Sequence, residues 1–383
     1  MSICSDKIFD VKEVNGVSDV VISGYYGLGN SGDEALLKTI VADLKKEAPG
    51  ITITALSGNK KQTRESFGIK TVNRYNPFTV CREICGAKLL ISGGGTLIQD
   101  ATSTKSLLYY LSIIRLAHFF KTRVMLYANG IGPIKNKNVR RVGRALNLAD
   151  VITLREDESV KELERCAVTK PKVFVTADPA FNLAPSDSRR TDELMKRFKI
   201  PHDRRLIAVS VRAWSGLKKD FEEKMAKSMD YISDKGYFPV FMPMQMSKDL
   251  EISVRISKLM KNGSAVVKCD VELEDLLGLI GRCSAACGMR LHMLIFAGVM
   301  AKPMAGVVYD PKIKGFMDYM GQKYYVPADE FDENKFNEIL NIITDNKDKL
   351  STVLAARREE LRIKAAENAK IAAMLINGKK KCN

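Results

Sequence analysis

Residues 20–34 read VVISGYYGLGNSGDE, and this stretch decides the fold. A short apolar run over 20–23 predicts a buried strand, the glycines after it permit a tight turn, and a helix is expected from Asp33 on. A strand that passes through a glycine-rich turn into a helix is the first unit of a doubly wound α/β domain. We therefore expect such a domain in the first part of the chain.

The same alternation continues through the 383 residues. In the first part, further strands are expected at 51–56, 89–92, 124–129, 151–154 and 173–176, and helices at 33–46, 106–120 and 139–148. The pattern restarts with strands at 206–211, 239–242, 265–268, 285–287 and 304–308, and helices at 221–233, 249–260, 273–280 and 291–299. Continuous apolar strands between helices indicate parallel sheets covered on both faces.

Two domains follow from this pattern. Residues 182–191 are polar, contain Pro185 and lack periodicity, so we expect an interdomain linker there. The predicted fold class is α/β, with two doubly wound Rossmann-like domains at 1–184 and 192–329 that face each other across a cleft. This arrangement resembles the GT-B architecture. Residues 330–383 are expected to form helices that pack back on the first domain.

Composition and charge limit the class of protein. The first twenty residues mix Asp, Lys and Glu and do not resemble a signal peptide. The longest apolar stretch, 107–120, contains Arg115 and is shorter than the roughly 20 residues needed to span a bilayer, so a cytoplasmic protein is expected. The net charge of +16 favours anionic partners. Nucleic acid is not expected, because no nucleic-acid-binding module is recognisable and aromatic residues are few.

The eight cysteines are expected to be reduced. The pairs Cys81/Cys85 and Cys283/Cys287 share a three-residue spacer, which would place each pair on one helix face. Because the spacers lack the turn residues typical of structural zinc sites, buried thiols are expected and a metal is not.

Gly27, Gly29 and Gly32 satisfy the dinucleotide pattern G-x-G-x-x-G. The second strand, however, ends in ALSG at 55–58 without the acid that would hold a ribose. Carboxylates at Asp33 and Glu34 would themselves satisfy the helix dipole and repel a pyrophosphate. The site suits neutral sugar hydroxyls, with Tyr26, Asn30 and Asp33 as candidate contacts. Glu34 is predicted to cap the helix, whereas capping and function stay equally open for Asp33.

The second motif, SGGGTLIQD at 92–100, follows the strand at 89–92. Three adjacent glycines allow a ligand to approach the backbone closely, although a tight turn would also use them. Hydrogen-bonding side chains follow at once. The candidate ligand contacts are Gly94, Gly95, Thr96 and Gln99.

Arg155 ends the strand at 151–154 and suits phosphate or carboxylate, unless it only pairs with Glu156 or Asp157. Asp178 follows the next strand. Arg212 and Trp214 follow the first strand of the second domain. Trp214 is the only tryptophan, and it can serve as a sugar platform or as core.

The segment CGMRLH at 287–292 combines a strand end, a glycine turn and a helix start. Backbone N–H groups, Arg290 and His292 can converge there on an anion. His292 is the only one of three histidines in such a context. Lys312 follows the next strand and can reach the same pocket, although it can also be a solvated loop residue.

Together these motifs resemble the polysaccharide pyruvyltransferases, in particular the CsaB type of secondary cell-wall polysaccharide synthesis. The resemblance covers residues 23–312 and rests on GYYG…GDE, GGGTLIQD, Asp178-Pro-Ala, Arg290-Leu-His292 and Tyr309-Asp-Pro-Lys312. It implies a GT-B-like fold and transfer of a pyruvyl ketal from phosphoenolpyruvate to an N-acetylmannosamine unit of a lipid-linked saccharide.

The resemblance also implies that His292 is the general acid. Phosphoenolpyruvate, a co-substrate, carries a phosphate and a carboxylate, so it needs several cations, and Arg155, Arg290 and Lys312 are expected to supply them, with no cofactor needed. We hypothesise that Asp33 orients or deprotonates the attacking hydroxyl. The acceptor contacts would be Tyr26, Asn30, Gly94, Gly95, Thr96, Gln99, Arg212 and Trp214. The basic surface is consistent with peripheral contact with an anionic inner membrane leaflet.

Three alternatives stay open. A GT-B glycosyltransferase with a nucleotide-sugar donor would share the cleft and the glycine loops. A non-catalytic anion- or nucleic-acid-binding protein would need no histidine beside Arg290. An NAD enzyme would match G-x-G-x-x-G but lacks the ribose-binding acid.

Overall fold

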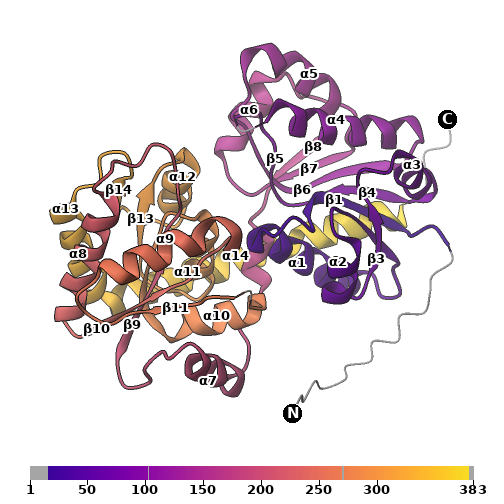
Figure 1. The fold of residues 1–383 in the computed structure, drawn as a ribbon. Coiled ribbons are helices and arrows are strands. Elements are labelled where there is room, and N and C mark those ends of the chain that lie inside the picture. The colour runs from indigo at the N-terminus through magenta and orange to yellow at the C-terminus, as the bar shows by residue number, and fades with distance from the viewer. Residues whose placement is uncertain (1–15, 102, 270, 379–383) are drawn as a thin grey trace. The chain divides into compact units, whose positions relative to one another are not determined.

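The computed structural model describes residues 16–101, 103–269 and 271–378. These residues form two compact units (Figure 1). The first unit holds the described residues up to Asp178 and those from Ala366 on, and the second holds Pro179–Ala365. Each unit contains one parallel sheet with helices on both faces, as expected.

The sheet of the first unit has the order β3-β2-β1-β4-β6-β7-β8, with β5 paired to β6. All six strands expected in this part of the chain form. Strands β3 and β5 were not predicted, because they are only four residues long and lack a continuous apolar run. The strands are β1 (Val20–Tyr26), β2 (Ile53–Ser57), β3 (Lys70–Asn73), β4 (Leu89–Ser92), β5 (Gly95–Ile98), β6 (Arg123–Ile131), β7 (Val151–Leu154) and β8 (Lys172–Val175).

Two hydrophobic clusters lie on the two faces of this sheet. One packs under α3 (Pro77–Gly86), α4 (Thr104–Phe119), α5 (Asn136–Leu146) and α6 (Glu158–Arg165). The other packs under α1 (Ser31–Glu47), α2 (Lys60–Phe67) and the last turns of α14 (Lys347–Asn377).

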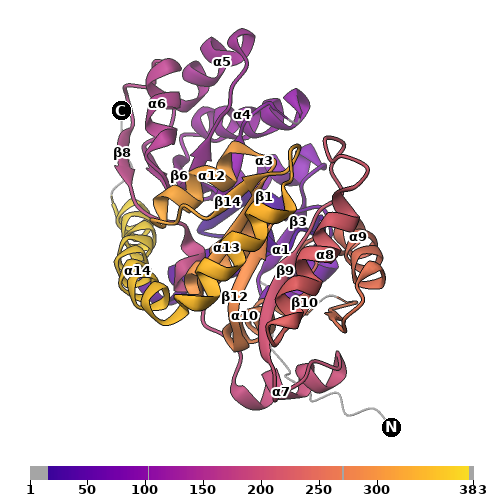
Figure 2. The same ribbon diagram turned by 90° about the vertical axis from the view of Figure 1, so that its left-hand side faces the viewer.

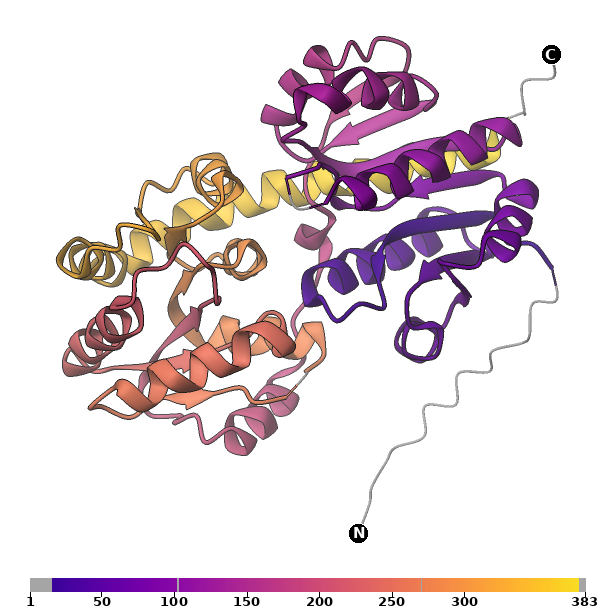
Figure 3. The same ribbon diagram turned by 45° about the horizontal axis from the view of Figure 1, so that its top comes forward.

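The end of α14 packs on the first unit, as Figure 3 shows for its yellow last turns. Ala372 and Ile376 are buried against the sheet. The buried Asn368 side chain accepts a hydrogen bond from the Thr176 hydroxyl at 2.8 Å and donates one to the Ala177 carbonyl at 3.2 Å. The chain therefore returns to its first unit after completing the second.

The sheet of the second unit has the order β11-β10-β9-β12-β13-β14. Figure 2 labels β10, β9, β12 and β14 of this sheet. The five expected strands form, and the short β14 is additional. They are β9 (Arg205–Ser210), β10 (Tyr237–Phe241), β11 (Ala265–Val266), β12 (Cys283–Gly288), β13 (Met304–Val308) and β14 (Tyr325–Pro327). One face is covered by α8 (Phe221–Asp234), α9 (Met246–Leu259) and α13 (Glu333–Asp345). The other carries α10 (Leu273–Arg282), α11 (Leu291–Val299) and α12 (Pro311–Tyr319).

Two local expectations need correction. Residues 182–191 lie inside the second unit and include the first turn of α7 (Ser188–Arg197), which the Asp187 side chain caps by accepting from the Arg190 N–H. Capping polar residues at a helix start were thus misread as a linker.

The second correction concerns the cysteines. Cys283 and Cys287 lie on strand β12, not on a helix, because their small apolar spacer fits a buried strand equally well. Both thiols are buried, and burial raises their pKa to about 12. Cys81 and Cys85 do lie on α3, but Cys85 is exposed and Cys81 half-buried. Cys4 and Cys382 lie outside the described residues.

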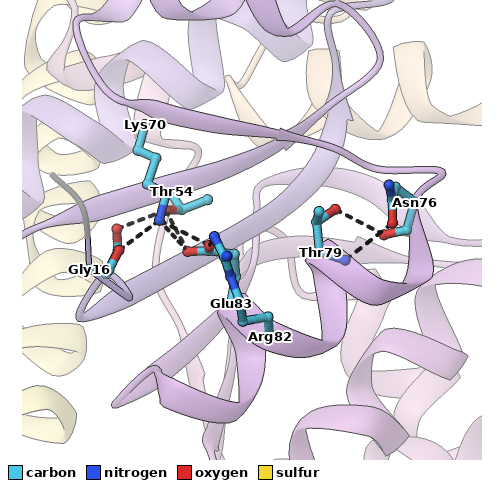
Figure 4. A network of polar contacts seen from close by, with 8 residues as sticks. Gly16, Thr54, Lys70, Asn76, Thr79, Arg82 and Glu83 are labelled. Atoms are coloured by element: carbon cyan, nitrogen blue, oxygen red, sulfur yellow. Dashed lines mark hydrogen bonds and ion pairs between the residues drawn. The ribbon is translucent and has the colours of Figure 1, made fainter. Parts of the chain in front are cut away.

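A buried ion pair fastens α3 to the amino edge of the first sheet (Figure 4). The Lys70 ammonium lies 2.9 Å from both carboxylate oxygens of Glu83, whose side chain is fully buried. Lys70 also donates to the Gly16 carbonyl at 2.7 Å, and Arg82 lies 3.2 Å from the same carboxylate. The network joins the start of β3, helix α3 and the segment that enters β1.

In the described part of the chain, no helix is both long and apolar enough to cross a membrane.

Candidate active site

The carboxyl ends of the first unit's parallel strands gather a cluster of charged side chains. Asp33 follows β1, Arg155 follows β7, and Asp178 follows β8. All three are buried. Strand ends that lie far apart in the sequence therefore bring two carboxylates and a guanidinium to one edge of the sheet.

Asp33 is held in the first turn of α1. The Asn30 side chain donates to its carboxylate through Nδ2 and accepts from the Gly32 N–H through Oδ1. Burial raises the pKa of Asp33 to about 7, the Glu34 carboxylate adds to the rise, and Arg155 and Arg74 oppose it. A carboxylate that titrates near neutral pH can both accept and release a proton under working conditions.

The three glycines after β4 are required for different structural reasons. A Cβ at Gly93 would lie 1.9 Å from the Tyr26 hydroxyl, and one at Gly94 would meet Leu36 at 3.3 Å. Gly95 has φ +91°, and its Cβ would lie 3.3 Å from Asp33 Oδ1. Close packing therefore explains Gly93 and Gly94, whereas Gly95 leaves backbone open beside Asp33. Tyr26, an expected acceptor contact, is fully buried beneath this loop.

Arg155 is engaged by protein groups on all three nitrogens. Nη1 donates to Asp178 at 2.7 Å, Nη2 donates to the Thr96 hydroxyl at 3.2 Å, and Nε lies 3.5 Å from Glu156. Burial opposes its charge, but the surrounding carboxylates raise the pKa of Arg155 overall. The ion pair with Glu156, one of the two interpretations from sequence, does form. The hydrogen bond from Nη2 holds Thr96 beside the cluster, and Gln99 lies half-buried just after β5.

Glu34 occupies the place where a dinucleotide phosphate would bind. Its Oε1 accepts from the Gly27 N–H at 2.7 Å, and the Leu28 N–H also bonds to the carboxylate. The amides of the G-x-G-x-x-G turn are thus already satisfied by an anion of the protein itself. Strand β2 ends at Ser57 with no acidic residue. Both observations oppose the NAD interpretation.

In the second unit, Arg290 is fixed by a carboxylate that sequence reasoning missed. Its Nε and Nη2 donate to the two oxygens of Asp249 at 2.9 and 2.5 Å, and Nη2 also reaches Gln245 Oε1 at 3.4 Å. Asp249 is fully buried in the first turn of α9. The start of a helix after β10 lies at the same edge as the end of β12, so topology could have indicated this partner.

Asp249 leaves one side of the Arg290 guanidinium available. An arginine has five N–H donors in a planar fork. Among the described contacts, Nη1 makes none, and 14% of the side chain is exposed. The side-on pair therefore orients the two Nη1 donors for an anionic group.

His292 and Lys312 stand in the first turns of α11 and α12, which follow the paired strands β12 and β13. Both side chains are half-buried. Asp310 caps α12 by accepting from the Lys312 N–H at 3.0 Å. Adjacent strand ends thus place Arg290, His292 and Lys312 at one edge of the second sheet.

Arg212 and Tyr309 bridge the end of β12. Arg212 follows β9 and Tyr309 follows β13, the two strands that flank β12 in the sheet. Arg212 Nη1 donates to the Tyr309 hydroxyl at 2.5 Å. Trp214 packs on Tyr309, with ring centroids 5.7 Å apart, and on the second core. Of the two roles left open for Trp214, its partly buried contacts favour core packing.

The expected site residues therefore divide between the units. Those of the first unit are Tyr26, Asn30, Asp33, Gly94, Gly95, Thr96, Gln99 and Arg155, and those of the second are Arg212, Trp214, Arg290, His292 and Lys312. Each group lies at the carboxyl edge of its sheet. The residues missed by sequence reasoning are Arg74, Gln245 and Asp249.

Comparison with known proteins addresses family and fold. The sequence pattern of the polysaccharide pyruvyl transferases matches residues 30–311. No curated protein sequence matches significantly.

Several solved structures share the fold. A glycosyltransferase from Rickettsia africae ESF-5 is 11% identical with a TM-score of 0.63, covering 94% of this chain and 100% of its own. The UDP-GlcNAc 2-epimerase of Neisseria meningitidis, bound to UDP-GlcNAc, is 11% identical with a TM-score of 0.62, covering 92% and 97%. Anabaena HepE, in complex with UDP and glucose, is 12% identical with a TM-score of 0.58, covering 93% and 95%. These similarities confirm the two-domain α/β fold class of GT-B enzymes.

Proposed function

Since the chain belongs to the polysaccharide pyruvyl transferase family, we propose that it moves a pyruvyl group from phosphoenolpyruvate to a saccharide. The proposed acceptor is an N-acetylmannosamine unit of a lipid-linked secondary cell-wall precursor, as in the CsaB type. The product is a cyclic ketal, and phosphate is released. The observation that carries the proposal is Arg290, held by Asp249, at the same sheet edge as His292 and Lys312.

The second unit's edge offers groups suited to the donor. Phosphoenolpyruvate carries a phosphate and a carboxylate, so it needs more than one cation. Arg290 presents Nη1 as a two-donor edge, and Lys312 adds a point charge two residues into α12. Asp249 acts as a positioning residue, because it fixes the plane of the guanidinium before the donor binds.

His292 is proposed as the general acid. Histidine titrates near neutral pH and can deliver a proton to the methylene carbon of phosphoenolpyruvate. Protonation generates a cation at C2, which a sugar hydroxyl attacks with loss of its proton. The C2–O bond to phosphate then breaks, its electron pair leaves with the phosphate, and a second hydroxyl attacks C2, loses its proton and closes the ketal. The methylene carbon gains one proton and becomes a methyl group. Of the two protons that the hydroxyls lose, one restores the acid form of His292 and the other is taken up by the released phosphate.

The first unit's cluster is proposed to receive the acceptor. Asp33 accepts the proton of the attacking hydroxyl or orients it, with Asn30, Gly95, Thr96 and Gln99 as hydrogen-bonding neighbours. Arg155 was expected to bind the donor. Its three engaged nitrogens support a different role, in which it holds Thr96 and stabilises the ionised form of Asp33.

The test is incubation with phosphoenolpyruvate and lipid-linked or nucleotide-linked N-acetylhexosamine acceptors, with products read by mass spectrometry. We expect a product heavier by one ketal-linked pyruvate and an equal amount of phosphate. His292→Ala should fold normally and lose transfer by at least about a hundredfold. His118→Ala is the matched control, because His118 is exposed at the end of α4.

The rival interpretation is a glycosyltransferase that uses a nucleotide-sugar. It predicts nucleotide release without phosphoenolpyruvate and a glycosylated product. Either that result or full activity of the His292→Ala variant would overturn the proposal.

A further inference from the structure

Three of the four helices on one face of the first unit, α3, α4 and α5, expose no carboxylate, whereas the fourth, α6, exposes Glu158 and Glu164. Between residues 74 and 149 the sequence contains only two acidic residues, Glu83 and Asp100. Both are fully buried. Glu83 turns toward Lys70 (Figure 4), and Asp100 accepts from the Lys135 N–H at 2.8 Å and from Asn138 Nδ2 at 2.6 Å.

This stretch forms α3, α4 and α5, which pack side by side on one face of the sheet. The outer side of α4 and α5 presents six exposed cations, and none of them forms an ion pair with a residue that the structure describes. They are Lys105, Arg115, Lys137, Arg140, Arg141 and Arg144. The Arg115 guanidinium donates to the Arg141 carbonyl at 3.3 Å, so the two exposed helix sides adjoin. We call the outer side of α3, α4 and α5 the basic face.

The basic face also exposes large apolar side chains. Phe119 at the end of α4 is 77% exposed, and Phe78 at the start of α3 is 85% exposed. On α4, Lys105, Leu108, Arg115 and Phe119 follow one another at helical spacing along a single exposed stripe. Cations and apolar side chains therefore alternate on the same surface instead of occupying opposite faces.

We propose that the basic face docks on an anionic lipid bilayer. Lysine and arginine side chains near such a surface are attracted by its negative potential, while exposed Phe and Leu insert at the boundary between headgroups and acyl chains. A purely solvated face would not need the exposed phenylalanines. A nucleic-acid strand would use the cations and stack bases on the exposed rings. The exposed Leu108, on the same stripe of α4 as Phe119, offers no stacking surface and favours the boundary of a lipid bilayer instead.

Docking of the basic face on a bilayer is separate from the proposed reaction and does not depend on it. Net charge alone assigned no surface, whereas the absence of exposed acid from three adjacent helices identifies one. If the acceptor is lipid-linked, the same docking brings the enzyme to the membrane that holds it.

The test is co-sedimentation of the full chain with vesicles. Vesicles of phosphatidylcholine with about one third phosphatidylglycerol should bind the protein, and pure phosphatidylcholine should not. The triple variant Lys137→Glu, Arg140→Glu, Arg144→Glu should bind at least about tenfold more weakly. Phe119→Ser should weaken the binding that persists at high salt, because it removes an apolar contact instead of a charge.

The matched control reverses three exposed cations of the second unit, Lys227→Glu, Lys258→Glu and Lys349→Glu. It changes the net charge equally and should bind nearly as the wild type does. Equal losses for both triple variants would overturn the proposal, because attraction would then follow total charge. Preferential binding to single-stranded DNA or RNA, with no binding to anionic vesicles, would also overturn it. Circular dichroism confirms that each variant is folded.

Discussion

At the scale of single residues, the two sheet edges use buried carboxylates in opposite ways. Asp249 accepts two hydrogen bonds from Arg290 and fixes its orientation, so that Nη1 stays available for an anion. Asp33 has no such bidentate partner: burial and Glu34 raise its pKa to about 7, and Arg155 only partly offsets them. Asp33, which is costly to ionise, is therefore suited to proton transfer, whereas Asp249, which is fully paired, is suited to holding the Arg290 side chain in place.

This difference predicts a pH-dependent effect of Asp33→Asn on stability. The folded-state pKa of Asp33, about 7, lies above the roughly 3.9 of an unfolded aspartate. Between these two pKa values only the unfolded state releases its proton as pH rises, so the free energy of unfolding falls from about pH 4, and the loss is complete once the pH has passed about 7. The neutral variant should unfold with a free energy about 2 kcal/mol or more higher than wild type at about pH 8, and nearly equal at about pH 4.

Urea unfolding at the two pH values measures this difference, and the same variant should lose transfer. A stability difference that stays constant with pH would show that Asp33 is not a perturbed buried acid. Full turnover by Asp33→Asn would remove Asp33 from the mechanism.

Sequence could identify some of these residues but not their states. A rare histidine beside an arginine at a glycine turn pointed to Arg290 and His292, and both lie at the expected sheet edge. The sequence gives no local sign that Asp249 contacts Arg290, because the two residues lie 41 positions apart. They meet only because β10, β9 and β12 are neighbours in the sheet. From sequence, Tyr26 is expected to contact a ligand, and Gly93 to admit a ligand or to form a turn. In the structure the Tyr26 hydroxyl fills the space that a side chain at Gly93 would need, so the two residues pack against each other.

At the scale of elements, α3 is attached to the sheet by the Lys70–Glu83 pair. Removal of one partner of a buried pair leaves an uncompensated charge, which costs more than the pair itself contributes. Lys70→Met should therefore destabilise the protein by about 3 kcal/mol, since Arg82 offsets only part of the loss.

The double variant Lys70→Met, Glu83→Gln should recover most of that loss, because no charge stays buried. Chemical denaturation of both variants makes the comparison. Equal destabilisation by the single and double variants would mean that the side-chain packing of Lys70, not its charge, fastens α3.

Elements with continuous apolar runs were predictable, and those defined by their neighbours were not. Strand β4 was placed residue for residue, since its four residues are all buried. Strand β5 contains Gly95 and pairs only with β6, so nothing local marks it. Helix α7 begins with a capping aspartate inside a polar stretch that also suits a loop.

At the scale of the whole molecule, the alternation of strands and helices was sufficient for the α/β class, and the solved structures confirm it. The course of the chain was harder to read. The first unit ends at Asp178 and is completed by residues from Ala366 on. Such a return depends on contacts like Asn368 with Thr176, which lie 192 positions apart and leave no local pattern.

The central claim is that the chain forms a ketal from phosphoenolpyruvate, with a proton delivered to its methylene carbon. The most direct measurement is transfer in deuterated water, with the product methyl group analysed by NMR and mass spectrometry. The account predicts one deuterium in the methyl group of the ketal and one phosphate released per ketal formed. Nucleotide release from a nucleotide-sugar, with phosphoenolpyruvate left unconsumed, would contradict it.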